Sequence, residues 1–347
     1  MAFTGILPGL TSDDSDQFES ALKKFVDARE LPLYKMMAYQ LGWVDQNGEP
    51  EPSVLQDRSH GHLVLATSQA AGGNNDSAMP YAVAVELLYN FLLVHEDVQN
   101  ANTERHARPT IWWAWGPAQA INAGDGIHAM ARLSIFEQIK AKGATSDPRS
   151  ISLALESLDN ATLEVCEGEY LDISNQERAT VGVGEIVTVA RKHGALFGIA
   201  AKLGGIAAAV DDSTLDALNR FGSAIGTAQN LNIDLLALWP EAGTERTEVQ
   251  RGRLQSKKKS LATAHAIETG TPATRLRLGE IFMKRVLDTA DLDELTSILA
   301  ETDSRAFAES KVRELIAEGI DALDSAGFDN EFKATLVESA NLIVGSN

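Results

Sequence analysis

The strongest constraint on this chain is its series of long segments rich in Ala, Leu, Ile and Val, which lack the apolar/polar alternation of β-strands. Its 10 prolines fall mostly near the gaps between these segments. The pattern predicts an all-α fold, and a chain of this size is able to enclose one core, so we expect a single domain over residues 1–347. The expected helices span 14–42, 54–71, 77–100, 111–142, 148–175, 183–210, 213–239 and 254–269, with several shorter helices after residue 273.

Two expected helices, 77–100 and 213–239, are apolar nearly all round, which predicts that they lie at the centre of a helical bundle. Carboxylates at the ends of such helices are costly to bury unless they are paired or bound to a metal ion. Glu96, Asp97 and Asn100 fall near one edge of the first helix. Because Mg²⁺ prefers oxygen ligands, these three residues are candidate Mg²⁺ ligands.

Charge and cysteine content limit the partners and the compartment. The 49 acidic and 30 basic residues give a net charge of −19, which repels nucleic acid and anionic lipid headgroups. A small anion binds such a protein only where local cations or metal ions reverse the field. Cys166 is the only cysteine, and the N-terminus has no basic region typical of a signal peptide, so we expect a cytoplasmic protein. The most apolar stretches are shorter than a membrane span and carry charged residues, so we expect no membrane span.

Several short motifs follow His95 in a fixed order. The run HEDVQNANTERHARPTIWWAWGPAQAINAGD resembles the first aspartate-rich region of the trans-isoprenyl diphosphate synthases, where HDDxxD precedes RRGxPT, a WG or FG pair and AINAGD. Further segments resemble that family's EGQxxD, KTxxLF, second aspartate-rich (GxAFQIQDDxxD) and GKKTL motifs. These segments are 167–172, 191–197, 226–237 and 257–261, and the resemblance extends over roughly residues 33–264.

The resemblance implies a class I isoprenoid synthase bundle around a central cavity, in which two carboxylate clusters on facing helices hold Mg²⁺ against the diphosphate of an allylic substrate. It also implies a dimer, since family members are commonly homodimers or heterodimers. On the second helix Ile233 and Ala237 replace two of the three aspartates. The resemblance implies catalytic roles for Asp97, Lys192 and Asp234, metal binding by Glu96, Asp97, Asn100 and Asp234, and substrate binding by Arg105, Lys192, Lys258, Lys259, Asn230 and Phe91.

The pocket for the second substrate, isopentenyl diphosphate, departs from the family pattern. Asp57 stands at the lysine of the GKxxRP motif, with Arg58 beside it, and His60 stands at the partner arginine. His106 replaces the second arginine of RRG. Two unit charges about 4 Å apart interact by about 4 kcal/mol at an effective dielectric constant near 20, so a lysine-to-aspartate change reverses a large contribution. Histidines, mostly neutral at pH 7, do not offset it.

These departures favour an enzyme that ionises an allylic diphosphate without using isopentenyl diphosphate, which is the chemistry of a terpene synthase. The alternatives are a prenyltransferase, either a polyprenyl diphosphate synthase or an enzyme with a different acceptor, and a catalytically silent subunit of a heteromeric synthase. Retention of Arg105, Lys192, Asp97 and Asp234 together favours an active enzyme over a silent subunit.

Overall fold

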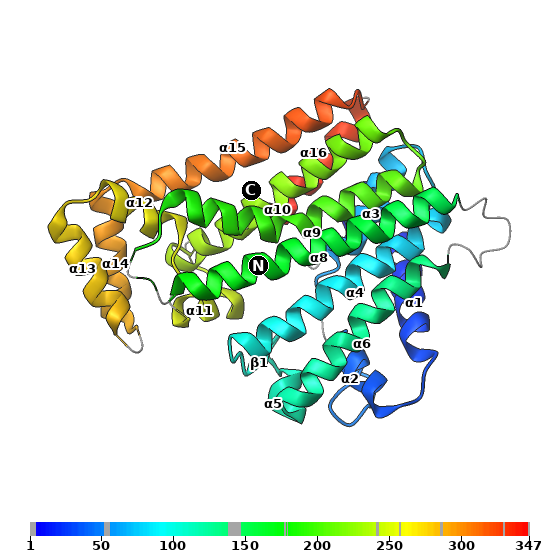
Figure 1. Cartoon of the computed structure of the whole chain (residues 1–347), viewed down its shortest axis with the longest axis horizontal. Helices are drawn as coiled ribbons and strands as arrows, with labels where there is room; N and C mark the ends of the chain where they lie inside the picture. Colours follow the sequence, from blue (N-terminus) through cyan, green and yellow to red (C-terminus); the bar gives the residue numbers. More distant parts are fainter. Residues whose placement is uncertain are drawn as a thin grey trace.

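The computed structural model describes residues 5–51, 56–137, 147–176, 178, 180–240, 243–256, 258–284, 287–328 and 330–345. These residues form helices joined by short loops and one β-hairpin (Figure 1), which confirms the all-α prediction. The helices are α1 (Ser12–Asp27), α2 (Pro32–Gln40), α3 (Ser59–Ala70), α4 (Asn75–Gln99), α5 (Ile111–Trp115), α6 (Pro117–Ile135), α8 (Pro148–Gln176), α9 (Val183–Ala207), α10 (Asp212–Leu238), α11 (Glu248–Gln255), α12 (Leu261–Thr269), α13 (Pro272–Met283), α14 (Thr289–Glu301), α15 (Ser304–Ser325) and α16 (Asn330–Val344). The hairpin pairs β1 (Glu104–Arg105) with β2 (Arg108–Pro109) in antiparallel orientation.

Three helices predicted as continuous are interrupted. The segment 14–42 divides into α1 and α2, because Pro32 begins a new helix at a position where its missing N–H needs no partner. The segment 111–142 divides at Gly116, whose φ of 86° ends α5 before Pro117 begins α6, and its residues 138–142 lie outside the described part. The segment 254–269 divides into α11 and α12, because the Ser260 side chain caps a new helix.

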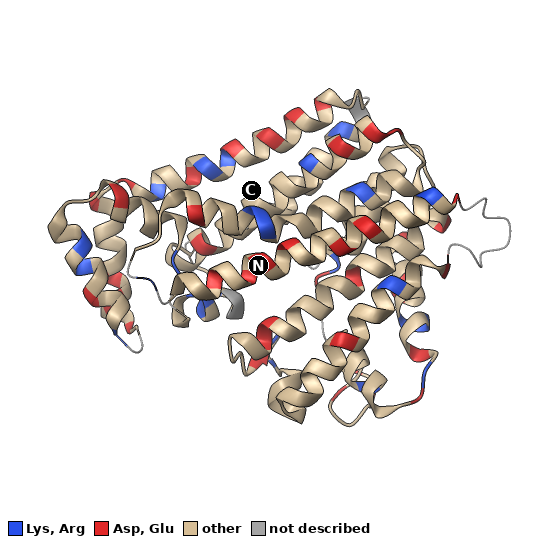
Figure 2. Ribbon diagram, viewed as in Figure 1, with Lys and Arg blue, Asp and Glu red and all other residues tan. Residues whose placement is uncertain are grey.

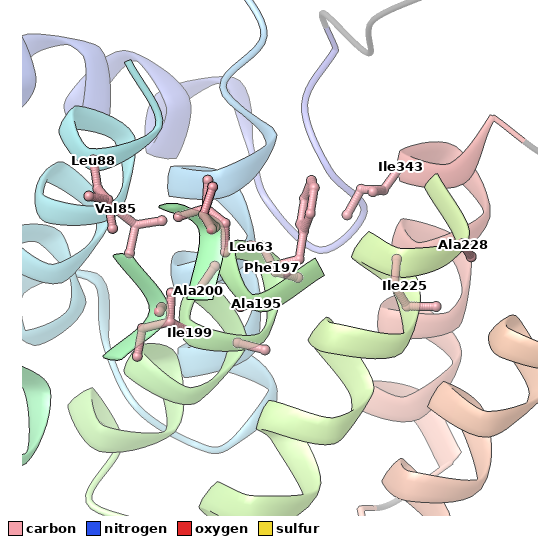
Figure 3. Packing of buried hydrophobic residues seen from close by; sticks show 14 of the residues in the cluster. Leu63, Val85, Leu88, Ala195, Phe197, Ile199, Ala200, Ile225, Ala228 and Ile343 are labelled. Atoms are coloured by element: carbon pink, nitrogen blue, oxygen red, sulfur yellow. The ribbon is translucent and has the colours of Figure 1, made fainter. Parts of the chain in front are cut away.

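The centre of the bundle is formed by α4, α9 and α10, as their apolar sequences predict. Helix α9 lies against α10, α8 and α3, while α4 lies against α6 and α3. Figure 3 shows part of the resulting core, to which α3 contributes Leu63, α4 contributes Val85, α9 contributes Phe197, and α10 contributes Ile225, which lies beside Gly319 of α15. Helix α15 packs along the outer side of α10 (Figure 1).

Helix α4 is long and apolar enough, by length and composition alone, to cross a membrane. Its most apolar stretch is 72% buried inside the protein. The helical packing therefore accounts for this apolar sequence, and α4 delivers its polar C-terminal residues to one end of the bundle.

Candidate functional site

The β1–β2 hairpin folds back over the end of α4 and places Arg105 on the two carboxylates predicted there. Arg105 Nε donates to both Asp97 oxygens at 3.1 Å, and its Nη2 lies 3.0 Å from Glu96 Oε2. Asn102 Nδ2 donates to Asp97 Oδ1 at 3.1 Å, which fixes the carboxylate further. The structure thus brings together Glu96, Asp97 and Arg105, three of the residues predicted from the sequence.

The hairpin owes its shape to the two residues at its tip. His106 and Ala107 have φ values of 54° and 56°, the conformation of a two-residue hairpin turn with positive φ at both positions. The loop entering the hairpin is fixed by the Asn102 carbonyl, which accepts hydrogen bonds from Thr110 Oγ1 at 2.7 Å and Trp112 Nε1 at 2.6 Å. His106 therefore occupies a turn, one residue after Arg105, which pairs with Glu96 and Asp97.

The second half of the site lies on α10 and α11. Asp234 of α10 accepts a hydrogen bond from Arg253 Nη1 of α11 at 2.8 Å, and both side chains are largely buried. Helix α11 also lies against the end of α4, since a Cβ placed on Gly252 would be 3.8 Å from Asn102 Oδ1. Helix α11 therefore contacts both α10, which carries Asp234, and the hairpin that follows α4. Figure 2 shows acidic positions at the β1 end of α4 and basic positions on α11 near them.

Helices α8 and α9 complete the site with further charged groups. Lys258 Nζ, which follows α11, lies 2.5 Å from Asp172 Oδ2, and His193 Nδ1 lies 3.6 Å from Glu169 Oε1. Glu169 Oε2 is buried and has no hydrogen-bond partner among the described residues. Carboxylates of α4, α8 and α10 thus share one partly buried region with His193 of α9 and the cations Arg105, Arg253 and Lys258.

Burial and neighbouring charge shift the pKa values of these groups in opposite directions. Burial raises the pKa of Glu169 to about 7, and nearby Glu96 and Asp172 add to this rise. Burial opposes ionisation of Glu96 too, but the positive charges of Arg105, Lys258 and Arg253 leave the pKa of Glu96 lowered. Burial, reinforced by Lys258 and Arg253, lowers the pKa of His193 to about 4, so this imidazole is neutral near pH 7.

The other residues predicted for the first substrate take several positions. Lys192 Nζ lies 2.5 Å from Glu167 on the neighbouring α8, a pair that is partly open to solvent. Lys259 donates to the carbonyls of Asn175 and Gln176 at 3.1 and 3.2 Å, so it holds the end of α8. Of the two adjacent lysines, the structure therefore brings Lys258 rather than Lys259 to the carboxylates.

Three remaining predicted residues lie on the helices themselves. Asn100 caps the C-terminus of α4, with its N–H bonded to the Glu96 carbonyl at 2.9 Å. Asn230 is half-buried on α10, one turn before Asp234. Phe91 is buried between α4 and α6, where its ring contacts His95 at 4.6 Å and His128 at 5.0 Å between ring centroids.

The residues at the expected second-substrate pocket are built into the protein interior. Arg58 donates to Glu19 at 2.9 Å, to Glu86 at 3.3 Å and to the Leu41 carbonyl at 2.8 Å. Asp57 is buried and accepts a hydrogen bond from the Ser59 N–H at 2.8 Å.

His60 is equally buried at this position. Its ring stacks between Tyr89 and Phe197, with centroid distances of 4.1 and 4.0 Å. Burial lowers the pKa of His60 to about 3, so the imidazole carries no charge near neutral pH. Asp57 and the neutral His60 thus offer no positive charge to a second diphosphate, and Arg58 is paired with Glu19 and Glu86.

The two halves of the site differ in their fit to Mg²⁺. Glu96 and Asp97 supply two carboxylates, which suits an ion that keeps several waters and binds through one or two carboxylates plus substrate phosphates. On α10, Asp234 is already bonded to Arg253, and Ile233 and Ala237 carry no ligand atoms. Within the described part of the chain, no three His, Cys, Asp or Glu side chains are grouped to hold a metal ion. The α4 half therefore offers Mg²⁺ two carboxylates, both paired with Arg105, and the α10 half offers one, paired with Arg253, so the α4 half fits the ion better.

Comparisons with known proteins agree with this arrangement. The polyprenyl synthetase family model matches residues 57–299. The (2E,6E)-farnesyl diphosphate synthase of Mycobacterium tuberculosis is 30% identical over 327 residues, covering 93% of this chain and 89% of that protein. The geranylgeranyl diphosphate synthase of the same organism is 29% identical over 307 residues, covering 88% and 85%.

Solved structures agree as well. The crystal structure of a polyprenyl synthetase from Streptomyces coelicolor A3(2) superposes with a TM-score of 0.85 at 27% identity, covering 98% of this chain and 99% of that one. The fold is that of the class I isoprenoid synthases. The chain belongs to the polyprenyl synthetase family.

The sequence interpretation missed one residue at the centre of the site, Arg253. It is one of several arginines in a short polar segment that includes Arg246 and Arg251, and no periodicity distinguishes it from them. Its spacing of five residues before Lys258 is the one available signal, because both residues then approach the carboxylates from the same segment.

Proposed function

We propose that the protein is a prenyltransferase that binds an allylic prenyl diphosphate between the ends of α4 and α10. The observation that carries the proposal is the convergence of Arg105, Arg253 and Lys258 on one region of a protein with a net charge of −19. Similarity to named farnesyl and geranylgeranyl diphosphate synthases supports it, and it favours the prenyltransferase alternative over the terpene synthase expectation.

The side chains support departure of a diphosphate group. Negative charge grows on the leaving oxygens when the allylic C–O bond breaks, and guanidinium and ammonium groups held in a partly dry site offset it. Mg²⁺ held by Glu96 and Asp97 would neutralise part of the same charge. Asp97 holds Arg105 on one side, and Asp172 holds Lys258 on the other. These carboxylates therefore position the cations before the substrate binds.

One observation favours the second candidate, a terpene synthase that needs no isopentenyl diphosphate. Arg58 is bonded to Glu19 and Glu86, and His60 is stacked between two aromatic rings, so neither is directed to an anionic second substrate. A prenyltransferase with this interior would take an acceptor other than isopentenyl diphosphate, or bind its diphosphate through residues outside 57–60.

Product analysis separates the candidates. The purified full chain is incubated with Mg²⁺ and geranyl, farnesyl or geranylgeranyl diphosphate, with and without isopentenyl diphosphate. A longer prenyl diphosphate formed only with isopentenyl diphosphate supports a polyprenyl diphosphate synthase. Release of diphosphate with a hydrocarbon or alcohol in its absence supports the terpene synthase. Stable substrates under every condition would contradict both and indicate a silent subunit.

Two variants test the division of the site into a retained and a lost half. Asp97→Ala removes the carboxylate that positions Arg105 and one Mg²⁺ ligand, so we expect activity to be abolished in the same assay. His106→Ala changes a turn residue that the sequence resemblance assigns to the second-substrate pocket, and we expect turnover of the allylic substrate to stay largely intact. Equal loss in both variants would contradict this division.

We also propose that the protein forms a homodimer. Leu163, Cys166, Tyr170 and Ile173 lie on one face of α8 at helical spacing, and all four are exposed. Leu163 and Tyr170 expose 61% and 71% of their surface, which is unusual for large apolar side chains arranged in a row. A second copy related by twofold symmetry would cover this face with the same face of its own α8.

A further inference from the structure

We infer that Arg253 takes the place of a divalent cation on α10, so that this half of the site binds a diphosphate through a guanidinium held by Asp234. The inference rests on the proposed function, because it requires a diphosphate between α4 and α10. It assigns Arg253, which no sequence motif indicated, as a substrate-binding residue.

The surface of α10 around Asp234 offers few ligands to a metal ion. A Mg²⁺ ion at a phosphate site is held by one or two protein carboxylates, while waters and phosphate oxygens supply its other ligands. Asp234 supplies one carboxylate, while Ile233 and Ala237, one residue before it and three residues after it, supply none. A cavity beside Asp234 is lined by apolar residues such as Leu238 and Phe282 and by the polar groups of Arg253, Lys258, Ser260 and Thr263, and Asp234 is the one carboxylate among its lining residues.

The Arg253 guanidinium is held by Asp234 through one of its nitrogens. Its Nη1 lies 2.8 Å from Asp234 Oδ1, and its side chain is 18% exposed. A guanidinium carries five N–H donors in a rigid plane. Among the described residues, Asp234 is the one hydrogen-bond acceptor of this guanidinium. The remaining donors are therefore available to phosphate oxygens, which arginine binds through two parallel hydrogen bonds.

The α4 half and the α10 half of the site each pair an acidic helix end with an arginine. Arg105 lies on Glu96 and Asp97 of α4, and Arg253 lies on Asp234 of α10. Gly252, next to Arg253, lies beside Asn102, which itself bonds Asp97. Both arginines lie near Glu96, where burial opposes ionisation and their positive charges lower the pKa. A diphosphate between them meets fixed positive charge on the α10 side without a metal ion.

Binding of inorganic pyrophosphate to the full chain tests this inference independently of turnover. Isothermal titration measures pyrophosphate affinity at saturating Mg²⁺, and electron paramagnetic resonance with Mn²⁺ counts the bound ions in the presence of pyrophosphate. We expect Arg253→Gln to weaken pyrophosphate binding by about tenfold or more. We expect Asp234→Asn to leave the number of bound Mn²⁺ ions unchanged, whereas Asp97→Asn lowers it.

The matched control is Arg251→Gln on the same helix. Arg251 is exposed and donates to the Arg246 carbonyl, so its replacement should leave pyrophosphate affinity unchanged. Circular dichroism checks that each variant is folded. If Arg253→Gln does not fold, Arg253→Lys, which keeps the charge but loses the planar pair of donors, should still weaken binding.

Three results would overturn the inference. Unchanged pyrophosphate affinity in the folded Arg253 variants would exclude a direct contact. Loss of a Mn²⁺ ion in Asp234→Asn would show that α10 binds a metal ion. The third result, no pyrophosphate binding by the wild-type chain with or without Mg²⁺, would overturn the proposed function as well, whereas the first two leave that function standing.

Discussion

Arg58, at the predicted second-substrate pocket, forms a buried ion pair with Glu86 in the protein interior. Arg58 contacts Glu19 on α1 and Glu86 in the middle of α4, and it also donates to the Leu41 carbonyl. Glu86 is completely buried and accepts a further hydrogen bond from the Gly61 N–H at 3.3 Å. A charge buried in this way is costly to leave unpaired, so Arg58 is required by the fold itself.

This network predicts a dependence of stability on pH. Burial raises the pKa of Glu86 from 4.5 to about 7, and Arg58 offsets part of that rise. The pKa of Glu86 is higher in the folded than in the unfolded state. The stability that protonated Glu86 gives the folded state is therefore fully present below pH 4.5 and is lost as the pH rises to about 7. We expect the wild type to lose about 3 kcal/mol of unfolding free energy relative to Glu86→Gln across this interval. Urea denaturation at several pH values measures it.

Glu19→Gln is the control with the opposite sign. Burial opposes ionisation of Glu19, but its bonds with Arg58 leave the pKa of Glu19 lowered, so its contribution is present above pH 4.5 and is lost as the pH falls. The wild type should therefore lose stability relative to Glu19→Gln on acidification. A difference between wild type and Glu86→Gln that does not change with pH would contradict the assignment of Glu86.

At the scale of single residues, the sequence predicts side chains fixed by their own helix better than side chains brought in by another one. Glu96, Asp97 and Asp234 follow from their positions at the ends of apolar helices and from motif order. Arg253 depends on how α11 folds back toward α4, which no local pattern encodes. The roles of Lys258 and Lys259 likewise separate only when the end of α8 lies beside them.

Helices α9 and α10 approach each other so closely at Gly222 that their backbones are in contact. A Cβ added to Gly222 would lie 2.1 Å from the Phe197 carbonyl oxygen, a contact that requires the helices to separate. Gly222→Ala should therefore lower the unfolding free energy by about 1–3 kcal/mol. Because α9 and α10 carry His193 and Asp234, the same change should lower activity.

Gly279→Ala is the matched control for this prediction. Gly279 lies inside the exposed helix α13, and an added Cβ would meet no atom within 4 Å. Alanine is favoured over glycine in a helix, so this variant should gain about 1 kcal/mol in chemical denaturation. Destabilisation of both variants by the same amount would mean that the close contact of α9 and α10 is not the cause.

At the scale of elements, the sequence predicts helices well and short connections poorly. The long apolar segments become α3, α4, α8, α9 and α10 close to their expected bounds. The β1–β2 hairpin has two residues in each strand, too few for any periodicity to appear. The break between α11 and α12 depends on the Ser260 cap, which resembles any other serine in a polar segment.

At the scale of the whole molecule, a strongly acidic protein concentrates buried cations where its substrate is expected. Arg105, Arg253 and Lys258 are each largely buried against a carboxylate, so their positions do not depend on the salt around them. The net charge of −19 repels anions from the rest of the surface. Together these features favour one anion-binding region over non-specific binding elsewhere.

Helix α8 carries residues of the candidate site on one side and the exposed apolar residues Leu163 and Tyr170 on the other. Glu169 and Asp172 face Lys258 and His193, while Leu163 and Tyr170 are exposed. Replacing both Leu163 and Tyr170 by Asp should convert a dimer to a monomer in light scattering after gel filtration, since charges are costly in an apolar interface.

Leu276→Asp, at a 65% exposed position on α13, should leave the dimer intact. A wild-type chain that is monomeric at micromolar concentration would exclude this interface. If the double variant is monomeric and also loses activity, packing of α8 against a second copy supports the position of Asp172 and Lys258 in each subunit.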